Sequence, residues 1–278
     1  MHNTISPTPP VALTIAGSDC SAGAGLQADL KTFQHYRVHG LCAVTCVVSE
    51  TANIVRSVHP VPVPMVIDQA SLLLDSFPVA AVKTGMLYSA ALVRETASLL
   101  RRSHRPPLVV DPVMVASTGA PLLEPDAIAA YLHELLPLAT LVTPNIPEAE
   151  TLLKTTIHNE REMEQAALEL SLLCGTSVLL KGGHLTGDSA SDVLAHHGRA
   201  DWFHAPRIPS HASHGTGCTL SAAITAGLAH GHDLSHAIAA AKHFLGQSII
   251  TSYSFPSSPP LHALNQSTLA VSGPHPHP

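Results

Sequence analysis

The stretch from residue 11 to residue 26, VALTIAGSDCSAGAGL, decides the fold class. Its first six residues, VALTIA, are continuously apolar or β-branched, which is typical of a strand that is covered on both faces. A loop of small residues follows, and a helical spacing of apolar residues begins at Leu26. A buried strand, a loop and a helix form the repeating unit of a parallel sheet with helices on its faces.

The same unit recurs along the chain. Further strands are expected at residues 40–49, 79–84, 108–111, 140–143 and 177–181. Helices are expected at residues 26–36, 65–77, 90–101, 125–135 and 160–173, where apolar residues recur every three or four positions. A hairpin (191–197 and 202–205, turning at 197–199) and two Ala-rich helices, 219–230 and 234–252, complete the pattern, with Gly231 as a stop between the helices. The sequence therefore predicts an α/β fold with a mostly parallel sheet.

The ends of the chain differ from its middle. Residues 1–10 are expected to form a flexible N-terminus, and residues 11–254 a single domain. From residue 255 the composition turns to Ser, Pro and His, which cannot bury enough apolar surface to become ordered. Residues 255–278 are therefore expected to form a disordered tail. Its histidines are scattered, and metal binding by them is the less favoured interpretation.

Composition excludes several classes of partner. The formal net charge is -6 and the longest basic run is the pair Arg101-Arg102, so no electrostatic footprint for nucleic acid is present. The five cysteines are odd in number and lack CxxC spacing, which favours a reducing compartment over a disulfide framework. No secretory leader and no membrane span are recognised, so the expectation is a soluble cytoplasmic protein without a membrane partner.

Six short motifs follow expected strands, at the edge where open parallel sheets bind ligands. They are AGSDCSAGAG (16–25), VKTGM (82–86), DPVM (111–114), TPNIPEAE (143–150), LLKGGH (179–184) and HGTGC (214–218). Taken singly, most have a structural interpretation: a tight turn, a satisfied Lys83, or a helix cap by Asn145 and Glu148. Asp111 could hold Mg²⁺ through water or cap the next turn.

The last motif is the most suggestive. Gly215-Thr216-Gly217 frees successive amides just before an Ala-rich helix, which is a geometry that binds anions and stabilises a phosphoryl group during transfer. Cys218 would feel the positive end of that helix, which favours the thiolate form. The structural alternative is a small cysteine that packs at a helix start.

In this order, the six motifs resemble those of the hydroxymethylpyrimidine/phosphomethylpyrimidine kinases of thiamine biosynthesis, in the ribokinase-like superfamily. The likeness runs from about Val11 to Ser252. It implies a three-layer α/β/α domain, ATP with Mg²⁺, a homodimer, and phosphorylation of 4-amino-5-hydroxymethyl-2-methylpyrimidine and then of its monophosphate.

The resemblance also implies roles for individual residues. Gly17, Asp29, Met86, Val113 and Cys218 stand where the family surrounds the pyrimidine. Lys181, Asn145 and Thr143 are assigned to the nucleotide, Glu148 and Asp111 to the metal, and Gly215, Thr216 and Gly217 to the catalytic anion hole. Cys218 could remove the hydroxyl proton, or could contribute only its amide.

Position 50 departs from the family pattern. The family usually has a TAQNT segment whose Gln binds the aminopyrimidine, and Glu50 stands at that position here. An ionised Glu only accepts hydrogen bonds, so it would suit the exocyclic amine or a protonated ring nitrogen. We therefore expect the substrate to be kept and its recognition chemistry to be altered. Two alternatives remain: a pyridoxal or pyridoxine kinase, and a non-catalytic vitamin-precursor binding protein of the same fold.

Overall fold

The computed structural model describes residues 8–115, 122–124, 126–185 and 187–267. Within these residues, nine strands form one sheet in the order β3-β2-β1-β4-β5-β6-β7-β8-β9. The strands are β1 (Val11–Asp19), β2 (His39–Thr51), β3 (Ile54–Pro60), β4 (Val79–Thr84), β5 (Leu108–Val110), β6 (Leu141–Val142), β7 (Ser177–Lys181), β8 (Asp192–His196) and β9 (Arg199–Phe203). The strands from β2 to β7 are parallel to their neighbours, and β3, β8 and β9 pair antiparallel at the two edges.

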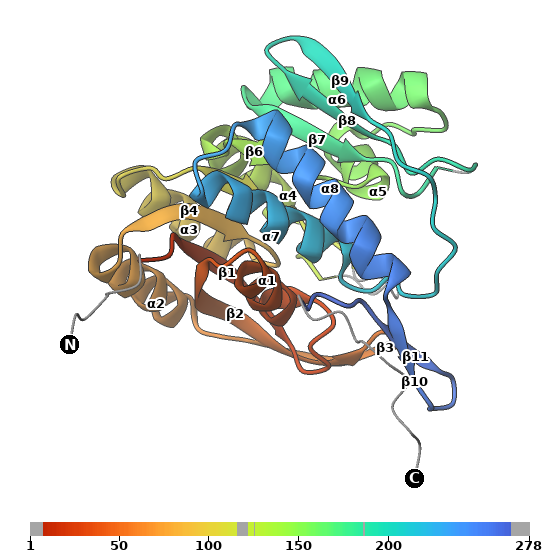
Figure 1. Cartoon of the computed structure of the whole chain (residues 1–278). Coiled ribbons are helices and arrows are strands. Elements are labelled where there is room, and N and C mark those ends of the chain that lie inside the picture. Colours follow the sequence, from red (N-terminus) through yellow and green to blue (C-terminus); the bar gives the residue numbers. More distant parts are fainter. Residues whose placement is uncertain (1–7, 116–121, 125, 186, 268–278) are drawn as a thin grey trace, which may run out of the picture.

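Helices cover both faces of the sheet (Figure 1). One layer contains α1 (Gly25–His35), α7 (Thr216–Ala229) and α8 (Leu234–Ile250), which pack against one another. The other contains α2 (Val63–Ser76), α3 (Ala90–Arg102), α4 (Ala127–Ala130), the π-helical turn η1 (Tyr131–Leu135), the 3-10 turn η2 (Leu136–Leu138), α5 (Ile146–Leu153) and α6 (Glu160–Cys174). The expected three-layer α/β/α architecture is confirmed.

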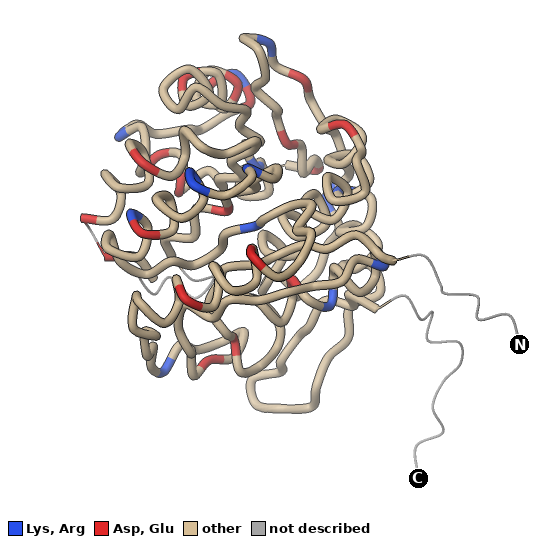
Figure 2. The backbone as a smooth tube through the Cα atoms, turned by 90° about the vertical axis from the view of Figure 1, so that its left-hand side faces the viewer, with Lys and Arg blue, Asp and Glu red and all other residues tan. Residues whose placement is uncertain are grey.

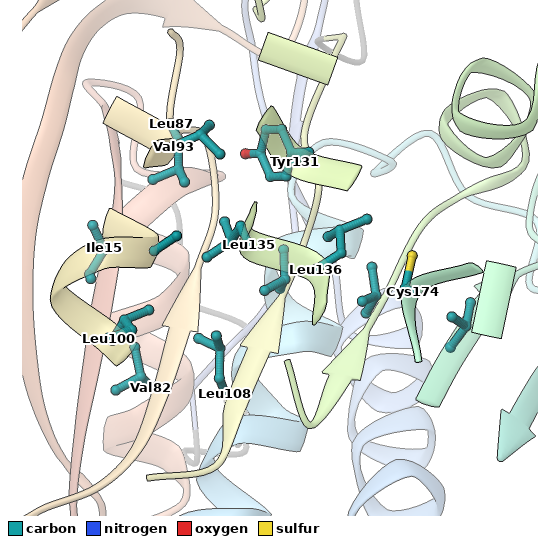
Figure 3. Packing of buried hydrophobic residues seen from close by; sticks show 14 of the residues in the cluster. Ile15, Val82, Leu87, Val93, Leu100, Leu108, Tyr131, Leu135, Leu136 and Cys174 are labelled. Atoms are coloured by element: carbon teal, nitrogen blue, oxygen red, sulfur yellow. The ribbon is translucent and has the colours of Figure 1, made fainter. Parts of the chain in front are cut away.

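The two layers explain why the strands are continuously apolar. Along β5, Leu108 and Val110 belong to the core under α3 and η1, whereas Val109 faces the core under α7 and α8. Figure 3 shows the first of these cores, where Tyr131 and Leu135 pack over the strands. Alternate residues of one strand are thus buried on opposite faces, so each position must be apolar.

The structure differs from the sequence prediction at two places. Strand β3 was not expected, because most of its residues are exposed and its composition carries no core alternation. The expected disordered tail is wrong for residues 255–267: β10 (Tyr253–Phe255) and β11 (Leu261–Ala263) form a hairpin, and Leu264 after it is 2% exposed. Residues 1–7 and 268–278, where the other expected flexible ends fall, lie outside the described residues.

The chain carries few charged residues, and acidic and basic positions are interspersed along its backbone (Figure 2). No helix in the described part of the chain is long and apolar enough to cross a membrane.

A buried ion pair joins the helix α1 to the sheet. Lys83 Nζ on β4 lies 2.8 Å from each carboxylate oxygen of Asp29 on α1, and both side chains are 0% exposed. Thr14 on β1 donates a further hydrogen bond to Asp29 (2.6 Å). Burial by itself would lower the pKa of Lys83, but the charge of Asp29, together with smaller contributions that include Asp111 and the hydrogen bond to Asp29, raises that pKa. The structural interpretation of Lys83 is thereby confirmed.

We predict that Lys83→Met lowers the free energy of unfolding by about 3–5 kcal/mol, because it leaves the Asp29 carboxylate buried without its counter-charge. Urea denaturation would measure the change. The control is Arg94→Met, which breaks the exposed Arg94–Glu134 pair and should cost no more than about 1 kcal/mol. Equal losses in the two variants would contradict the prediction.

Candidate active site

The candidate site lies at the carboxyl ends of the parallel strands. Strands β1 and β4 are neighbours in the sheet, and the helices that follow them along the chain, α1 and α3, lie on opposite faces of it. Open α/β sheets bind ligands at such a switch point. The loop between β1 and α1, residues 20–24, belongs to the small-residue stretch found in the sequence.

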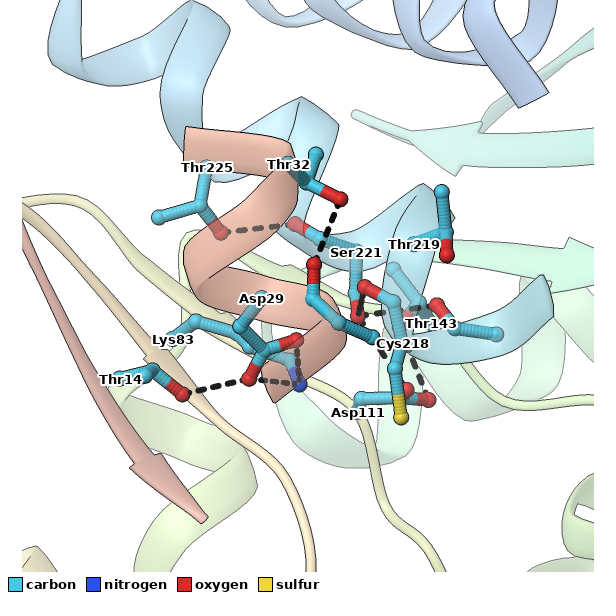
Figure 4. A network of polar contacts seen from close by, with 12 residues as sticks. Thr14, Asp29, Thr32, Lys83, Asp111, Thr143, Cys218, Thr219, Ser221 and Thr225 are labelled. Carbon is cyan, nitrogen blue, oxygen red and sulfur yellow. Dashed lines mark hydrogen bonds and ion pairs between the residues drawn. The ribbon is translucent and has the colours of Figure 1, made fainter. Parts of the chain in front are cut away.

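At the centre of the site a carboxylate and an ammonium group form a buried pair. Lys181 Nζ lies 3.0 Å from Asp111 Oδ1, which also accepts a hydrogen bond from Thr143 (3.3 Å), while Ser221 donates to Asp111 Oδ2 (3.2 Å). Burial alone would raise the pKa of Asp111, but Lys181 and Lys83 outweigh it and lower that pKa. Asp111 is thus ionised, and it is held by Lys181 on β7, by Ser221 on α7 and by Thr143 directly after β6. Figure 4 shows Asp111 with Thr143 and Ser221.

The segment Gly215-Thr216-Gly217, here called the GTG loop, lies directly over the Lys181–Asp111 pair. A Cβ added to Gly217 would lie 3.2 Å from Lys181 Nζ and 3.6 Å from Asp111 Oδ2. Gly217 belongs to the first turn of α7, whose amides have no partners inside the helix. An ammonium group, a carboxylate and a helix N-terminus therefore meet at one point.

Next to this point, Asn145 and Glu148 form a capping box at the start of α5. Asn145 Oδ1 accepts from the Glu148 amide (2.9 Å), and Glu148 Oε2 accepts from the Asn145 amide (2.8 Å). Burial, opposed by Lys181, raises the pKa of Glu148 to about 7. The capping interpretation is confirmed, and the same carboxylate interacts electrostatically with Lys181 and Asp111.

The two glycine-containing loops interlock. Gly215, with φ +82°, would place a Cβ 2.0 Å from the Gly23 carbonyl oxygen, so only glycine fits there. His214 Nε2 contacts Asp19 Oδ2 at 2.9 Å, and Asp19 also accepts from the amides of Gly23 and Ala24. Burial would raise the pKa of Asp19, but its hydrogen bonds, that with His214 first, lower it to about 2. Asp19 thus joins the loop after β1 to the loop before α7.

Cys218 differs from the expectation. Burial raises the pKa of its thiol to about 11, although the Lys83 charge and a hydrogen bond from the Gly25 amide act in the opposite direction. Asp29 and Asp111 add to the rise. The prediction that the helix N-terminus favours the thiolate is therefore wrong, because burial raises the thiol pKa instead.

The expected substrate side lies over β1, β2 and β4. Gly17 touches Cys46 and Met86, since a Cβ on Gly17 would lie 2.7 Å from Cys46 Sγ and 3.5 Å from Met86 Sδ. Val113 packs against the same apolar cluster. Glu50, at the end of β2, is half-buried, and burial followed by repulsion from Asp19 raises its pKa to about 7.

Not every predicted residue lines the site. Asp29 and Thr143 are both 0% exposed. Asp29 accepts a hydrogen bond from Lys83, and Thr143 donates one to Asp111, so both support other residues of the site. The sequence reasoning assigned no role to Asp19 or Ser221. Both residues could have been found in the sequence. Asp19 belongs to the AGSD motif, and Ser221 follows Cys218 by three residues, which places the two on the same side of the expected helix.

Comparisons with known proteins agree with this geometry. A family model described as phosphomethylpyrimidine kinase matches residues 19–258. The chain belongs to the phosphomethylpyrimidine kinase family. A hydroxymethylpyrimidine/phosphomethylpyrimidine kinase of Haemophilus influenzae is 42% identical over 241 residues, covering 85% of this chain and 90% of the relative. A thiamine biosynthesis bifunctional protein of Geobacter sulfurreducens is 44% identical over 85% of this chain, which spans 48% of that longer protein.

Solved structures of similar proteins confirm the ribokinase-like fold. A Bacillus subtilis pyridoxal kinase in an ADP complex has a TM-score of 0.84 and 34% identity, covering 93% of this chain and 98% of its own. A Clostridium difficile phosphomethylpyrimidine kinase has a TM-score of 0.76 and 36% identity, covering 86% and 99%. The phosphomethylpyrimidine kinase family thus shares its fold with pyridoxal kinases, and this chain is a phosphotransferase.

We predict that Gly215→Ala lowers the free energy of unfolding much more than Gly231→Ala does. Both glycines have almost the same φ, +82° and +81°, but a Cβ on Gly231 meets nothing within 4 Å. Gly231→Ala should therefore cost only the left-handed backbone penalty, about 1–2 kcal/mol. Gly215→Ala should cost several kcal/mol in total, because the two loops must also separate. Thermal or urea unfolding measures both, and equal costs would contradict the interlocking of the loops.

Proposed function

We propose that this protein transfers the γ-phosphoryl group of ATP to the hydroxymethyl group of 4-amino-5-hydroxymethyl-2-methylpyrimidine, and then phosphorylates the monophosphate. The observation that carries the proposal is the position of Gly217 over the Lys181–Asp111 pair at the N-terminus of α7. A charged phosphoryl group in transfer needs such fixed donors and cations around its oxygens. A protein that only bound the pyrimidine would not need them.

In this proposal the residues act as follows. Lys181 contacts the phosphates of ATP, and the first-turn amides at Gly217 and Cys218 bind the oxygens of the transferred group. Asp111 lies beside the path of the transferred group and keeps Lys181 oriented. The pyrimidine lies over Gly17, Met86 and Val113, with its amine toward Glu50.

Asp111 and Glu148 fit a magnesium ion by the chemistry of their oxygens, since Mg²⁺ prefers carboxylate, phosphate and water oxygens. In the described part of the chain no group of three or more His, Cys, Asp or Glu side chains could hold a metal by itself. The two carboxylates would therefore hold Mg²⁺ together with the phosphates of ATP and water. When bound, Mg²⁺ supplies positive charge to the phosphate oxygens.

The raised pKa of Cys218 argues for an anion-hole amide rather than a general base. With a pKa of about 11, the thiol is almost entirely protonated at pH 7.5. We predict that Cys218→Ala, which keeps the amide, lowers kcat by less than about tenfold, because general-base catalysis is worth about 10²–10⁴-fold. Steady-state kinetics with the pyrimidine measures this.

The comparison variant is Lys181→Met, which removes a charge at the phosphates and should lower kcat by more than about a hundredfold. A loss in Cys218→Ala as large as in Lys181→Met would instead identify the sulfur as the base.

The raised pKa of Glu50 alters its expected role. Near pH 7 about half of the Glu50 carboxyl groups carry a proton, and a protonated carboxyl offers one donor and one acceptor, as the family Gln does. The aminopyrimidine edge offers an amine donor and a ring-nitrogen acceptor, so one shared proton satisfies both partners. We therefore propose that Glu50 binds the pyrimidine with one proton held between carboxyl and ring.

This gives a pH dependence with a definite sign. Below the Glu50 pKa of about 7 the proton is already bound, and above it each complex must take a proton from solution. The KM for the pyrimidine should therefore rise above pH 7, approaching about tenfold per pH unit. Glu50→Gln carries a permanent donor and should have a KM nearly independent of pH from 6 to 9. An identical pH dependence in both proteins would refute this role.

Pyridoxal phosphorylation is the second candidate, because solved pyridoxal kinases match this chain with TM-scores of 0.84 to 0.86. Pyridoxal has no exocyclic amine to satisfy Glu50, which favours the pyrimidine. The deciding experiment compares kcat/KM of the purified protein for the hydroxymethylpyrimidine, its monophosphate and pyridoxal, with ATP and Mg²⁺. A preference for pyridoxal would overturn the proposal, and tight binding without turnover would support the binding protein.

We also propose that the protein forms a homodimer and is located in the cytoplasm. The apolar side chains of Val47 on β2 and Ile54 on β3 are each 50% exposed, which supports the packing of a second copy of the chain against this edge of the sheet. All five cysteines are unpaired, which suits a reducing compartment.

A further inference from the structure

The C-terminal segment packs against the loops of the site. We name residues 253–267, which contain the hairpin β10–β11, the strap. The family match ends at residue 258, so most of the strap lies beyond it. Leu264 and Gln266 are nevertheless buried, with 2% and 5% exposure. Such burial needs an explanation, because the composition of this segment does not favour order.

The buried contact of the strap is a hydrogen bond to α7. Gln266 Nε2 donates to Thr219 Oγ1 over 2.8 Å, and Thr219 is 0% exposed. Thr219 follows Cys218 directly, and its amide donates to the Gly215 carbonyl (2.9 Å). Gln266 is thus tied to the residue that closes the first turn of α7.

The other contacts of the strap fix it to neighbouring segments. The amide of Asn265 donates to the Ser248 carbonyl on α8 (3.1 Å). This bond sets the position of the next residue, Gln266, relative to helices α7 and α8. The rings of His262 and His211 lie 5.2 Å apart, so the strap also touches the segment that leads into the GTG loop. Asn53, in the β2–β3 turn close to Glu50, donates to the Pro260 carbonyl (3.4 Å). In Figure 1 the hairpin lies beside β3 accordingly.

We propose that Gln266 is a positioning residue for phosphoryl transfer: through Thr219 it holds the first turn of α7, and with it the anion hole, in place over the Lys181–Asp111 pair. The inference rests on the proposed function for the role of that turn. Anion-hole donors act through their orientation, so an unanchored turn lowers the rate of transfer more than the binding of either substrate.

The test uses the full chain with volume-conserving substitutions. Gln266→Met removes the donor, Thr219→Val removes the acceptor, and the double variant removes both. Each single variant should lower kcat about five- to tenfold, with KM for ATP and pyrimidine within about twofold, and the double variant should lose no more than either single one. The matched control is Gln247→Met on α8, where the side chain is exposed, and its kcat should equal that of the unchanged protein.

Two results would overturn the proposal. One is an unchanged kcat in Gln266→Met despite a lower melting temperature, which would make the contact purely structural. The other is multiplication of the two single losses in the double variant. Hydrogen exchange serves as a readout without activity: amides of residues 218–220 should exchange faster in Gln266→Met, and those of β5 should not. If the unchanged protein phosphorylates neither pyrimidine, the proposed function fails, and this exchange measurement still decides whether the strap holds the turn.

Discussion

The buried pair between Lys181 and Asp111 is the interaction on which the arrangement of the site depends. The two charges come from β7 and the end of β5, and they are stable in the interior only because each neutralises the other and because Thr143 and Ser221 complete the hydrogen bonding. A second pair, Lys83 with Asp29, lies close enough to influence the pKa of Asp111. Two cations and two anions thus lie beneath the first turn of α7, and the helix N-terminus adds further positive potential at one point.

Glycine allows the upper side of the site to close over these charges. Gly215 and Gly23 approach so closely that no side chain fits between them. Asp19 and His214 then join the same two loops, although they are 195 residues apart in the chain. The strap adds a third support from the C-terminal side. The first turn of α7 is therefore held by segments from the beginning and from the end of the chain.

Two titratable groups show how burial decides protonation here. A helix N-terminus stabilises an anion by about 0.3–1 kcal/mol, whereas raising the pKa of Cys218 from 9.0 to about 11 corresponds to about 3 kcal/mol against the thiolate. Burial and the neighbouring carboxylates therefore outweigh the helix. At Glu50 burial has a different consequence, since it raises the carboxyl pKa to about 7 and so gives the side chain a hydrogen-bond donor in its protonated form.

The sequence by itself determined the layered α/β fold, the strand-end positions of five motifs, the helix-start position of the sixth and the resemblance to a family, because these depend on local periodicity and on short, ordered motifs. Even the capping box of Asn145 and Glu148 could be predicted, since its partners are three residues apart. Only the tertiary structure decided which charges pair, that the Cys218 thiol is held neutral, and that Gln266 lies against Thr219. Those outcomes depend on desolvation and on contacts between residues far apart in the chain. The composition of a single segment reveals neither the desolvation of a side chain nor its distant contacts. For this reason the Pro- and Ser-rich residues 255–267 were expected to form a disordered tail, whereas they pack against the site.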